Sequence, residues 1–215
     1  MNRATFLLVG FLVAVTTLLG LSPAFAETSC AVDTVGIGPE WGTGQGALAL
    51  GEAVGQVFSA KEDTLISAIT VWRWAGQDSN LAGWHLWIAK ADSTGRPIPG
   101  SVLLDGPTLP GRYGDGITPT PFRFEFDPPF ALPARGNYEF AINDSPCYGT
   151  IRWLGNDNNA YAGGEVWVHY RSLECLLRDY PGDLANVDLI FQIEFCRPTT
   201  PARPETWGRL KATYR

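Results

Sequence analysis

Residues 122–143 read FRFEFDPPFALPARGNYEFAIN, and apolar side chains occupy every second position towards both ends of this stretch. In a strand, alternate residues point to opposite faces, so each end predicts a strand with one face on a core and the other in water. Pro133 and Gly136, between the two ends, suit a chain reversal. The stretch therefore predicts either a hairpin or two consecutive strands of one sandwich.

Similar patterns recur along the chain, separated by short turn signals. No segment shows a helical period over several turns, and the 24 Gly and 16 Pro residues favour turns over helices. We therefore predict an all-β fold, a two-sheet antiparallel β-sandwich of the jelly-roll type. The Cys–Trp–Cys spacing of an immunoglobulin domain is absent. Further strands are expected at 53–58, 64–74, 84–89, 102–104 with an extension to 109, 150–154, 165–170 and 187–195.

The alternation also predicts which side chains face the core. In the last strand, Leu189 and Phe191 are expected to point inward and Asp188 outward. Charged residues such as Glu139 fit the outward positions of their strands. The strand at 64–74 is apolar on both faces, which predicts a central or covered position. Ile66, Ala68, Thr70, Trp72 and Trp74 are expected to share one of its faces.

The ends of the chain differ from its middle. Arg3, an apolar run at 6–21 and the sequence Ala-Phe-Ala ending at Ala26 are typical of a secretory signal peptide, so no membrane span is expected after cleavage. A Pro-rich spacer follows the last strand. The expected segments are a signal peptide at 1–26, a Gly-rich lead-in without regular structure at 27–52, a β-sandwich at 53–196, a linker at 197–206 and a basic tail at 207–215.

All four cysteines lie beyond the predicted cleavage site, and an even number in an exported chain indicates two disulfides. None of their spacings fits a Cys-x-x-Cys zinc knuckle. The expected strand directions place Cys147 and Cys175 at one end of the sandwich. We therefore favour Cys147–Cys175 and Cys30–Cys196 among the three possible pairings.

Charge is distributed unevenly. After Cys196 the chain has five basic residues and one acidic residue, whereas residues 27–196 contain 10 basic and 21 acidic residues. An acidic body argues against a nucleic-acid partner. It is compatible with a neutral or cationic ligand.

The chain contains none of the common catalytic motifs, such as Gly-x-Ser-x-Gly or His-Glu-x-x-His. The two histidines, His85 and His169, each lie inside a predicted strand, where packed or surface roles are the usual ones. Carboxylates are plentiful, but no spacing singles out a glycosidase pair. In the polar loop at 155–164, Asp157 and Asn159 are candidate Ca²⁺ ligands, although a turn that uses Asn and Asp for its own hydrogen bonds is favoured.

Eight tryptophans are the strongest functional signal in the sequence. Trp84 and Trp87 have opposite parity in one strand, so at least one of them is expected to point away from the main core. Flat aromatic faces in a concave site with a few polar groups suit sugar rings. We therefore take Trp74, Trp87 and Trp167 as candidate ligand-binding residues. The alternative is that a loop covers the outward tryptophans.

Several motifs resemble those of secreted bacterial jelly-roll modules, similar to carbohydrate-binding and galactose-binding-like domains. The resemblance spans most of residues 53–195, concerns fold positions and supplies no catalytic set. It implies a jelly-roll fold and a binding role. The matching segments are Gly55-Gln56-Val57-Phe58, the strand from Ile66 to Trp72, Gly100 with Val102-Leu103, the Phe122–Ile142 stretch, Tyr161-Ala162-Gly163-Gly164 and Asp188-Leu189-Ile190-Phe191.

Taken together, these features predict a secreted or envelope-associated, non-catalytic module that binds a glycan or another cell-surface component. No cofactor is expected, and a structural Ca²⁺ is the less favoured alternative. One alternative is a structural envelope protein that displays its basic tail. A second alternative is a glycoside hydrolase.

Overall fold

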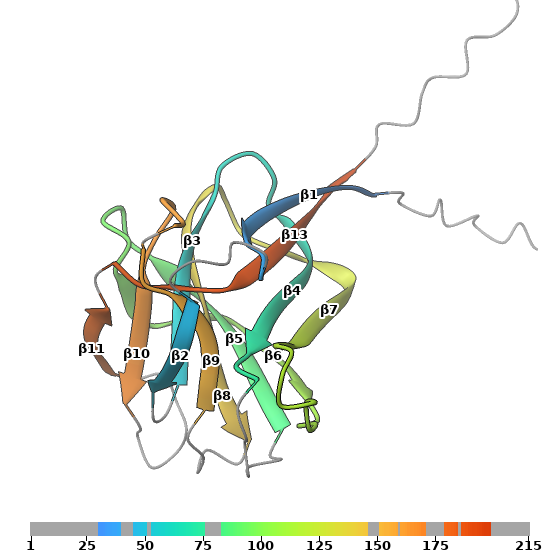
Figure 1. Cartoon of the computed structure of the whole chain (residues 1–215). Helices are drawn as coiled ribbons and strands as arrows, with labels where there is room; N and C mark the ends of the chain where they lie inside the picture. Colours follow the sequence, from blue (N-terminus) through green and yellow to red (C-terminus); the bar gives the residue numbers. More distant parts are fainter. Residues whose placement is uncertain are drawn as a thin grey trace, which may run out of the picture.

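The computed structural model describes residues 30–39, 45–50, 53–75, 83–145, 151–158, 160–170, 179–184 and 186–198. The predicted signal peptide and basic tail lie outside these residues. All regular elements in the described ranges are strands (Figure 1). They are β1 (Cys30–Ile37), β2 (Gln45–Leu50), β3 (Ala53–Ala60), β4 (Leu65–Arg73), β5 (Gly83–Ala91), β6 (Pro97–Leu109), β7 (Thr120–Ala131), β8 (Gly136–Ser145), β9 (Ile151–Asn156), β10 (Val166–Tyr170), β11 (Asp179–Leu184), β12 (Asp188–Leu189) and β13 (Phe191–Pro198).

The strands form two antiparallel sheets that pack as a sandwich. The seven-stranded sheet has the order β1-β13-β4-β9-β12, with β2 paired to β9 and β7 paired to β4. The six-stranded sheet has the order β11-β10-β3-β8-β5-β6. Within them, the sets β1-β13-β4-β7 and β3-β8-β5-β6 give the strand arrangement of a jelly roll. The predicted fold class is confirmed.

The stretch at 122–143 connects the two sheets. Its first half, β7, pairs with β4 in the seven-stranded sheet, and its second half, β8, pairs with β3 and β5 in the six-stranded sheet. The backbone N–H of Leu132, in the connection, donates to the carbonyl of Thr64 at 2.8 Å. The stretch is therefore two consecutive strands in opposite sheets rather than a hairpin.

Two strands, β1 and β2, lie in the Gly-rich segment that was expected to have no regular structure, so this expectation was wrong. β1 pairs with β13 along its whole length, and β2 pairs with β9. Gly36 has a φ of +131°, and a Cβ at this position would lie 2.2 Å from the carbonyl oxygen of Phe191. Glycine therefore permits the close approach of β1 to β13, which local propensity alone does not reveal.

The main core lies between the sheets and is rich in aromatic side chains. Trp84 and Trp153 are both buried there, with ring centroids 5.2 Å apart. A register shift between Ile66 and Ala68 changes the face alternation of β4, so that Ile66 shares the core face with Ile69. The predicted face that joined Ile66 to Ala68 and Trp72 was therefore wrong.

Asp188 is buried, which corrects the prediction that it points into water. Its Oδ1 accepts from the side-chain amide of Gln56 at 3.1 Å, and its Oδ2 accepts from the backbone N–H of Tyr161 at 2.9 Å. Burial raises the pKa of the Asp188 carboxyl. The network fixes the 161–164 loop against β3, since the Gln56 amide also donates to the carbonyl of Gly164.

Candidate functional site

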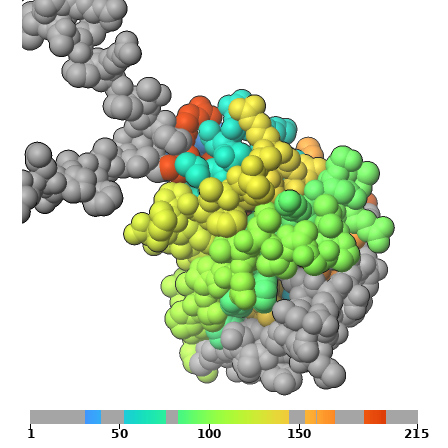
Figure 2. Space-filling model, turned by 180° about the vertical axis from the view of Figure 1, so that it is seen from behind, coloured from blue at the N-terminus to red at the C-terminus, as the bar shows by residue number. Residues whose placement is uncertain are grey.

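The outer face of the six-stranded sheet brings two of the predicted binding tryptophans into one cross-strand row. Trp87 of β5 pairs with Ala141 of β8, Ala141 pairs with Gly55 of β3, and Gly55 pairs with Trp167 of β10. Because neighbouring strands lie about 4.8 Å apart, three strand steps separate the tryptophan backbones by about 14 Å. Figure 2 shows this side of the molecule, with the green part of the chain that contains β5 and β6 across its middle.

These tryptophans do not form an open platform. Of Trp84 and Trp87, one was expected to point away from the main core, and Trp87 does so. However, Trp87 is only 8% exposed, and its indole N–H donates to Asn143 Oδ1 at 2.9 Å. Trp167 is half-buried. Trp74 follows β4 in the other sheet and packs on the cluster of Ile37, Leu154 and Ile190. The three predicted residues are therefore not brought together.

Beside the tryptophan row, Glu139 and His169 form a buried pair. Glu139 is 0% exposed, and its Oε1 lies 2.6 Å from Nε2 of His169, which is 1% exposed. The prediction that Glu139 is a solvated outward residue was wrong. It occupies the outward face of β8, as the alternation requires, but this face is covered. Burial raises the pKa of the Glu139 carboxyl, and the neighbouring His169 opposes this shift.

Gly55 makes room for this pair. Glu139 on β8 reaches across β3 to His169 on β10, and a Cβ at Gly55 would lie 2.0 Å from Glu139 Oε1. A glycine in a strand interior costs conformational entropy, and here it leaves space for a crossing side chain. The sequence contains no local signal of this contact, because the pair depends on register across three strands.

The second histidine is held by two groups at the edge of the same sheet. His85 Nε2 lies 2.6 Å from Asp105 Oδ1, and His85 Nδ1 lies 2.8 Å from Thr108 Oγ1. The register between β5 and β6 shifts between these two contacts. As a result Asp105 and Thr108, three residues apart in β6, both reach His85. The Asp105 side chain is 67% exposed. A carboxylate in this setting is strongly solvated, unlike the buried partner of His169.

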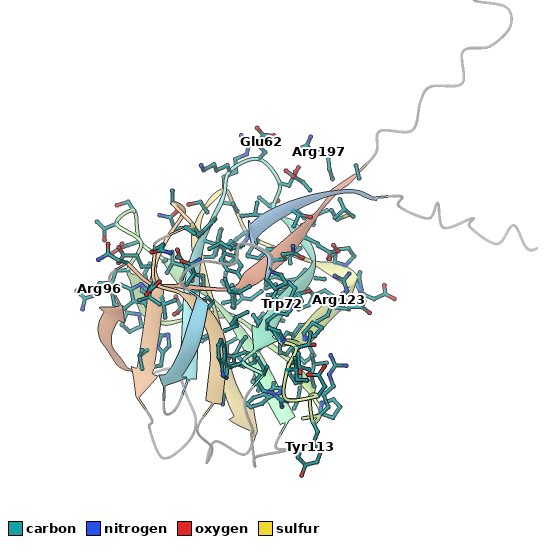
Figure 3. The ribbon with its side chains drawn as sticks, in the orientation of Figure 1. Glu62, Trp72, Arg96, Tyr113, Arg123 and Arg197 are labelled. Carbon is teal, nitrogen blue, oxygen red and sulfur yellow. The ribbon has the colours of Figure 1, made fainter. Side chains whose placement is uncertain are left out.

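An open pocket lies at one end of the sandwich, which we call the rim pocket. It has a volume of about 340 Å³. At this end the cyan turn after β3 lies beside the red end of β13 (Figure 2), and Glu62 and Arg197 come from these two segments (Figure 3). The pocket is lined by Asp33, Val35, Ser59, Lys61, Glu62, Asp63, Tyr161, Ala162, Gly163 and Phe195.

Tyr161 is the principal aromatic wall of the rim pocket. Its ring packs edge-to-face on Phe191 at a centroid distance of 5.1 Å, and its hydroxyl accepts from the backbone N–H of Ser59 at 3.3 Å. A Cβ at Gly163 would lie 2.3 Å from the Tyr161 ring, so glycine permits the ring to lie against this loop. Burial raises the pKa of the Tyr161 phenol, so the hydroxyl stays protonated and remains a hydrogen-bond donor.

Charged groups surround the mouth of the rim pocket. Arg197 Nη2 lies 2.8 Å from Asp63 Oδ2 and 3.1 Å from Glu62 Oε2. The hydrogen bond from Arg197 holds the pKa of the Asp63 carboxyl below its usual range. Asp33, from β1, accepts no hydrogen bond on its carboxylate within the described residues. No sequence pattern singles out these residues, since three separate segments meet only in the fold.

The predicted Ca²⁺ ligands are not assembled into a site in the described structure. Asp157 is exposed, and Asn159 lies outside the described residues. Asn156 Oδ1 accepts from the backbone N–H of Asn158 at 2.8 Å, which is the turn chemistry favoured as the alternative. Among the described residues there is no group of three or more His, Cys, Asp or Glu side chains that could hold a metal ion.

The disulfide pairings remain predictions. Cys196 is buried and its thiol is not free. Cys30 pairs in register with Pro198, two residues beyond Cys196, so both cysteines lie at the same end of adjacent strands. The side chain of Cys30 and the whole of Cys147 and Cys175 lie outside the described part of the chain.

The fold and the site together define the class of this protein, which is a jelly-roll β-sandwich with a polar and aromatic pocket at one end. In the described ranges no helix has the length and apolar character needed to cross a membrane. Comparisons with protein families, with curated proteins and with solved structures found no significant match.

Proposed function

We propose that this protein is an exported, non-catalytic binding module whose ligand is a glycan, and that the rim pocket is its binding site. The observation that supports the site most strongly is the pocket itself. Its volume of about 340 Å³ falls within the range of small-molecule sites, about 300–1,000 Å³. The sequence supports export through the predicted signal peptide at 1–26.

The chemistry of the lining fits a hydroxylated ligand. The Tyr161 ring supplies a flat apolar surface, and its hydroxyl can donate a hydrogen bond. The Ser59 hydroxyl can accept one, since its own proton is donated to Asn137 Oδ1 at 2.7 Å. The Asp33 carboxylate is an acceptor within the same pocket. A sugar ring presents apolar C–H faces and peripheral hydroxyls, so it can use both kinds of contact at once.

A binding role is favoured over glycoside hydrolysis. Hydrolysis needs one carboxyl group whose pKa is raised so that it can act as a general acid. The pKa of Asp63 in the rim pocket is shifted in the opposite direction by Arg197. The pKa values of Glu139 and Asp188 are raised, but both carboxyls are buried and neither lines the pocket.

A glycan array followed by calorimetric titration tests the proposal. We expect at least one array glycan to bind, and Tyr161→Ala to weaken binding at least tenfold, whereas Tyr113→Ala leaves it unchanged. Tyr113 is a matched control because it is exposed and lies at the opposite end of the molecule from Glu62 (Figure 3). Tyr161→Phe keeps the ring and its packing, so it separates loss of the hydroxyl from loss of fold.

Two outcomes would contradict the proposal. Binding that is insensitive to both Tyr161 substitutions would place the ligand elsewhere. Failure to bind any polysaccharide would favour the structural, envelope-associated role.

A further inference from the structure

We infer that the rim pocket selects ligands that carry a protonated amine, so that among glycans it prefers amino sugars with a free amine to their N-acetylated forms. This inference rests on the proposed function and specifies the ligand class of the same pocket. It depends on the placement of the charges in and around the pocket.

Acidic groups outnumber basic groups in the lining of the rim pocket. Asp33, Glu62 and Asp63 line the pocket together with one cation, Lys61. Arg197, just outside the lining, adds a second positive charge that is hydrogen-bonded to Asp63 and Glu62 and attracts Asp33 without a hydrogen bond. The lining alone is therefore net negative, with three carboxylates and one ammonium group, while Arg197 and Arg135 act on Asp63 from beside it. The pocket is also part of a chain segment that is acidic as a whole.

Asp33 is the acidic group available to a ligand. Asp63 receives two guanidinium nitrogens from Arg197, at 2.8 Å from Nη2 and 3.1 Å from Nε. The carboxylate of Asp33 has no such donor within the described residues. It is exposed on β1, directly opposite Phe195 in the register of β1 and β13. An ammonium group beside Asp33 would form a charge-assisted hydrogen bond with a carboxylate that accepts none from the described residues.

An organic amine fits better than a metal ion. The described residues provide no set of three acidic or imidazole side chains placed to hold a metal. The pocket is also much larger than a bare ion, with a volume of about 340 Å³ and apolar walls from Val35, Tyr161 and Phe195. These walls can bury the body of a sugar while its amine lies at the acidic mouth.

The test compares chitosan oligomers with chitin oligomers of the same length, which differ in N-acetylation. Titrations use the folded full chain at a pH at which the chitosan amine is protonated. We expect the chitosan oligomer to bind at least tenfold more tightly and its affinity to fall as salt is added. Asp33→Asn should remove most of this preference. Asp105→Asn, which removes the same charge from the six-stranded sheet outside the pocket, should not.

The outcomes distinguish failure of the amine preference from failure of glycan binding. Equal affinity for the two oligomers would overturn the amine preference and leave glycan binding intact. A chitosan preference that Asp33→Asn and Asp105→Asn reduce equally would show a non-specific charge effect and would also overturn the inference. If neither oligomer binds but another array glycan does in a Tyr161-dependent manner, the amine preference fails alone. If no glycan binds, both proposals fail.

Discussion

Nε2 of His169 lies 2.6 Å from Oε1 of Glu139, although the two residues belong to strands separated by β3. Both side chains are buried on the outer face of the six-stranded sheet. His85 and Asp105 have the same separation of 2.6 Å at the edge of that sheet, but there the carboxylate is exposed. The described part of the chain thus contains two His–carboxylate contacts of equal length and different burial.

We predict that these contacts differ strongly in their effect on stability. Glu139→Ala removes the carboxylate that contacts a buried imidazole and should cost about 3–5 kcal/mol. Asp105→Ala breaks an exposed contact and should cost less than about 1 kcal/mol. Urea unfolding of both variants measures the difference. Similar losses in the two variants would show that burial does not determine the strength of these contacts.

The pH dependence of stability should report the burial of Glu139. Burial raises the pKa of this carboxyl above that of the unfolded chain, which is about 4.3 for an unperturbed glutamate. Between the two pKa values the folded state holds a proton that the unfolded state has released, so the stabilising contribution present at low pH is lost as the pH rises.

The glutamine side chain in Glu139→Gln does not titrate, so this variant should lack the pH-dependent contribution of Glu139 to stability. The stability of the native chain relative to Glu139→Gln should therefore decrease as the pH rises above about 4.3. Unfolding free energies of the two proteins, measured over a series of pH values, provide the comparison. A difference that stays constant or grows with pH would mean that Glu139 is not desolvated in the folded state.

Gly55→Ala should be destabilising because the added methyl group would collide with the side chain of Glu139. The atoms nearest to a methyl group added at this position are those of Glu139, the closest at 2.0 Å. We expect a loss of roughly 1–3 kcal/mol, as for other overpacked sites. In a Glu139→Ala background the space is free, so the same substitution should be nearly neutral. Equal costs in both backgrounds, from a double-mutant cycle, would show that backbone strain rather than Glu139 sets the penalty.

Non-reducing peptide mapping should recover two disulfides, Cys30–Cys196 and Cys147–Cys175. The first bond agrees with the antiparallel pairing of β1 with β13. It also agrees with the finding that Cys196 is not a free cysteine. Each bond should contribute about 2–4 kcal/mol by restricting the unfolded chain. Recovery of free thiols, or of a Cys30–Cys147 peptide, would rule out this pairing.

The sandwich was predictable from sequence because its signal is local and repeated. Phe122, Phe124 and Phe140 alternate with polar residues, and all three are buried in the core. The pattern could not distinguish a hairpin from a sheet crossing, because alternation reports the face of a strand and not its partner. β1 was missed because Gly36 weakens local propensity, while pairing with β13 compensates for it.

The candidate site was less predictable, because it depends on contacts between distant segments. Glu139 and Asp188 obey the strand alternation, yet their polar partners His169 and Gln56 lie 30 and 132 positions away in the chain. The rim pocket likewise joins β1, the turn after β3 and the loop at 161–163. Tryptophan content indicated a binding role but directed attention to the outer sheet face, where Trp87 proves to be covered.

Mapping the bound ligand by amide chemical-shift perturbation tests the central claim most directly. The ¹⁵N-labelled chain is titrated with the tightest-binding glycan from the array. The rim-pocket assignment predicts that the largest shifts cluster in the segments 33–35, 59–63 and 161–163, which contribute most of the pocket lining. Shifts centred instead on His85, Trp87 and Trp167, or no shifts with any glycan, would contradict it.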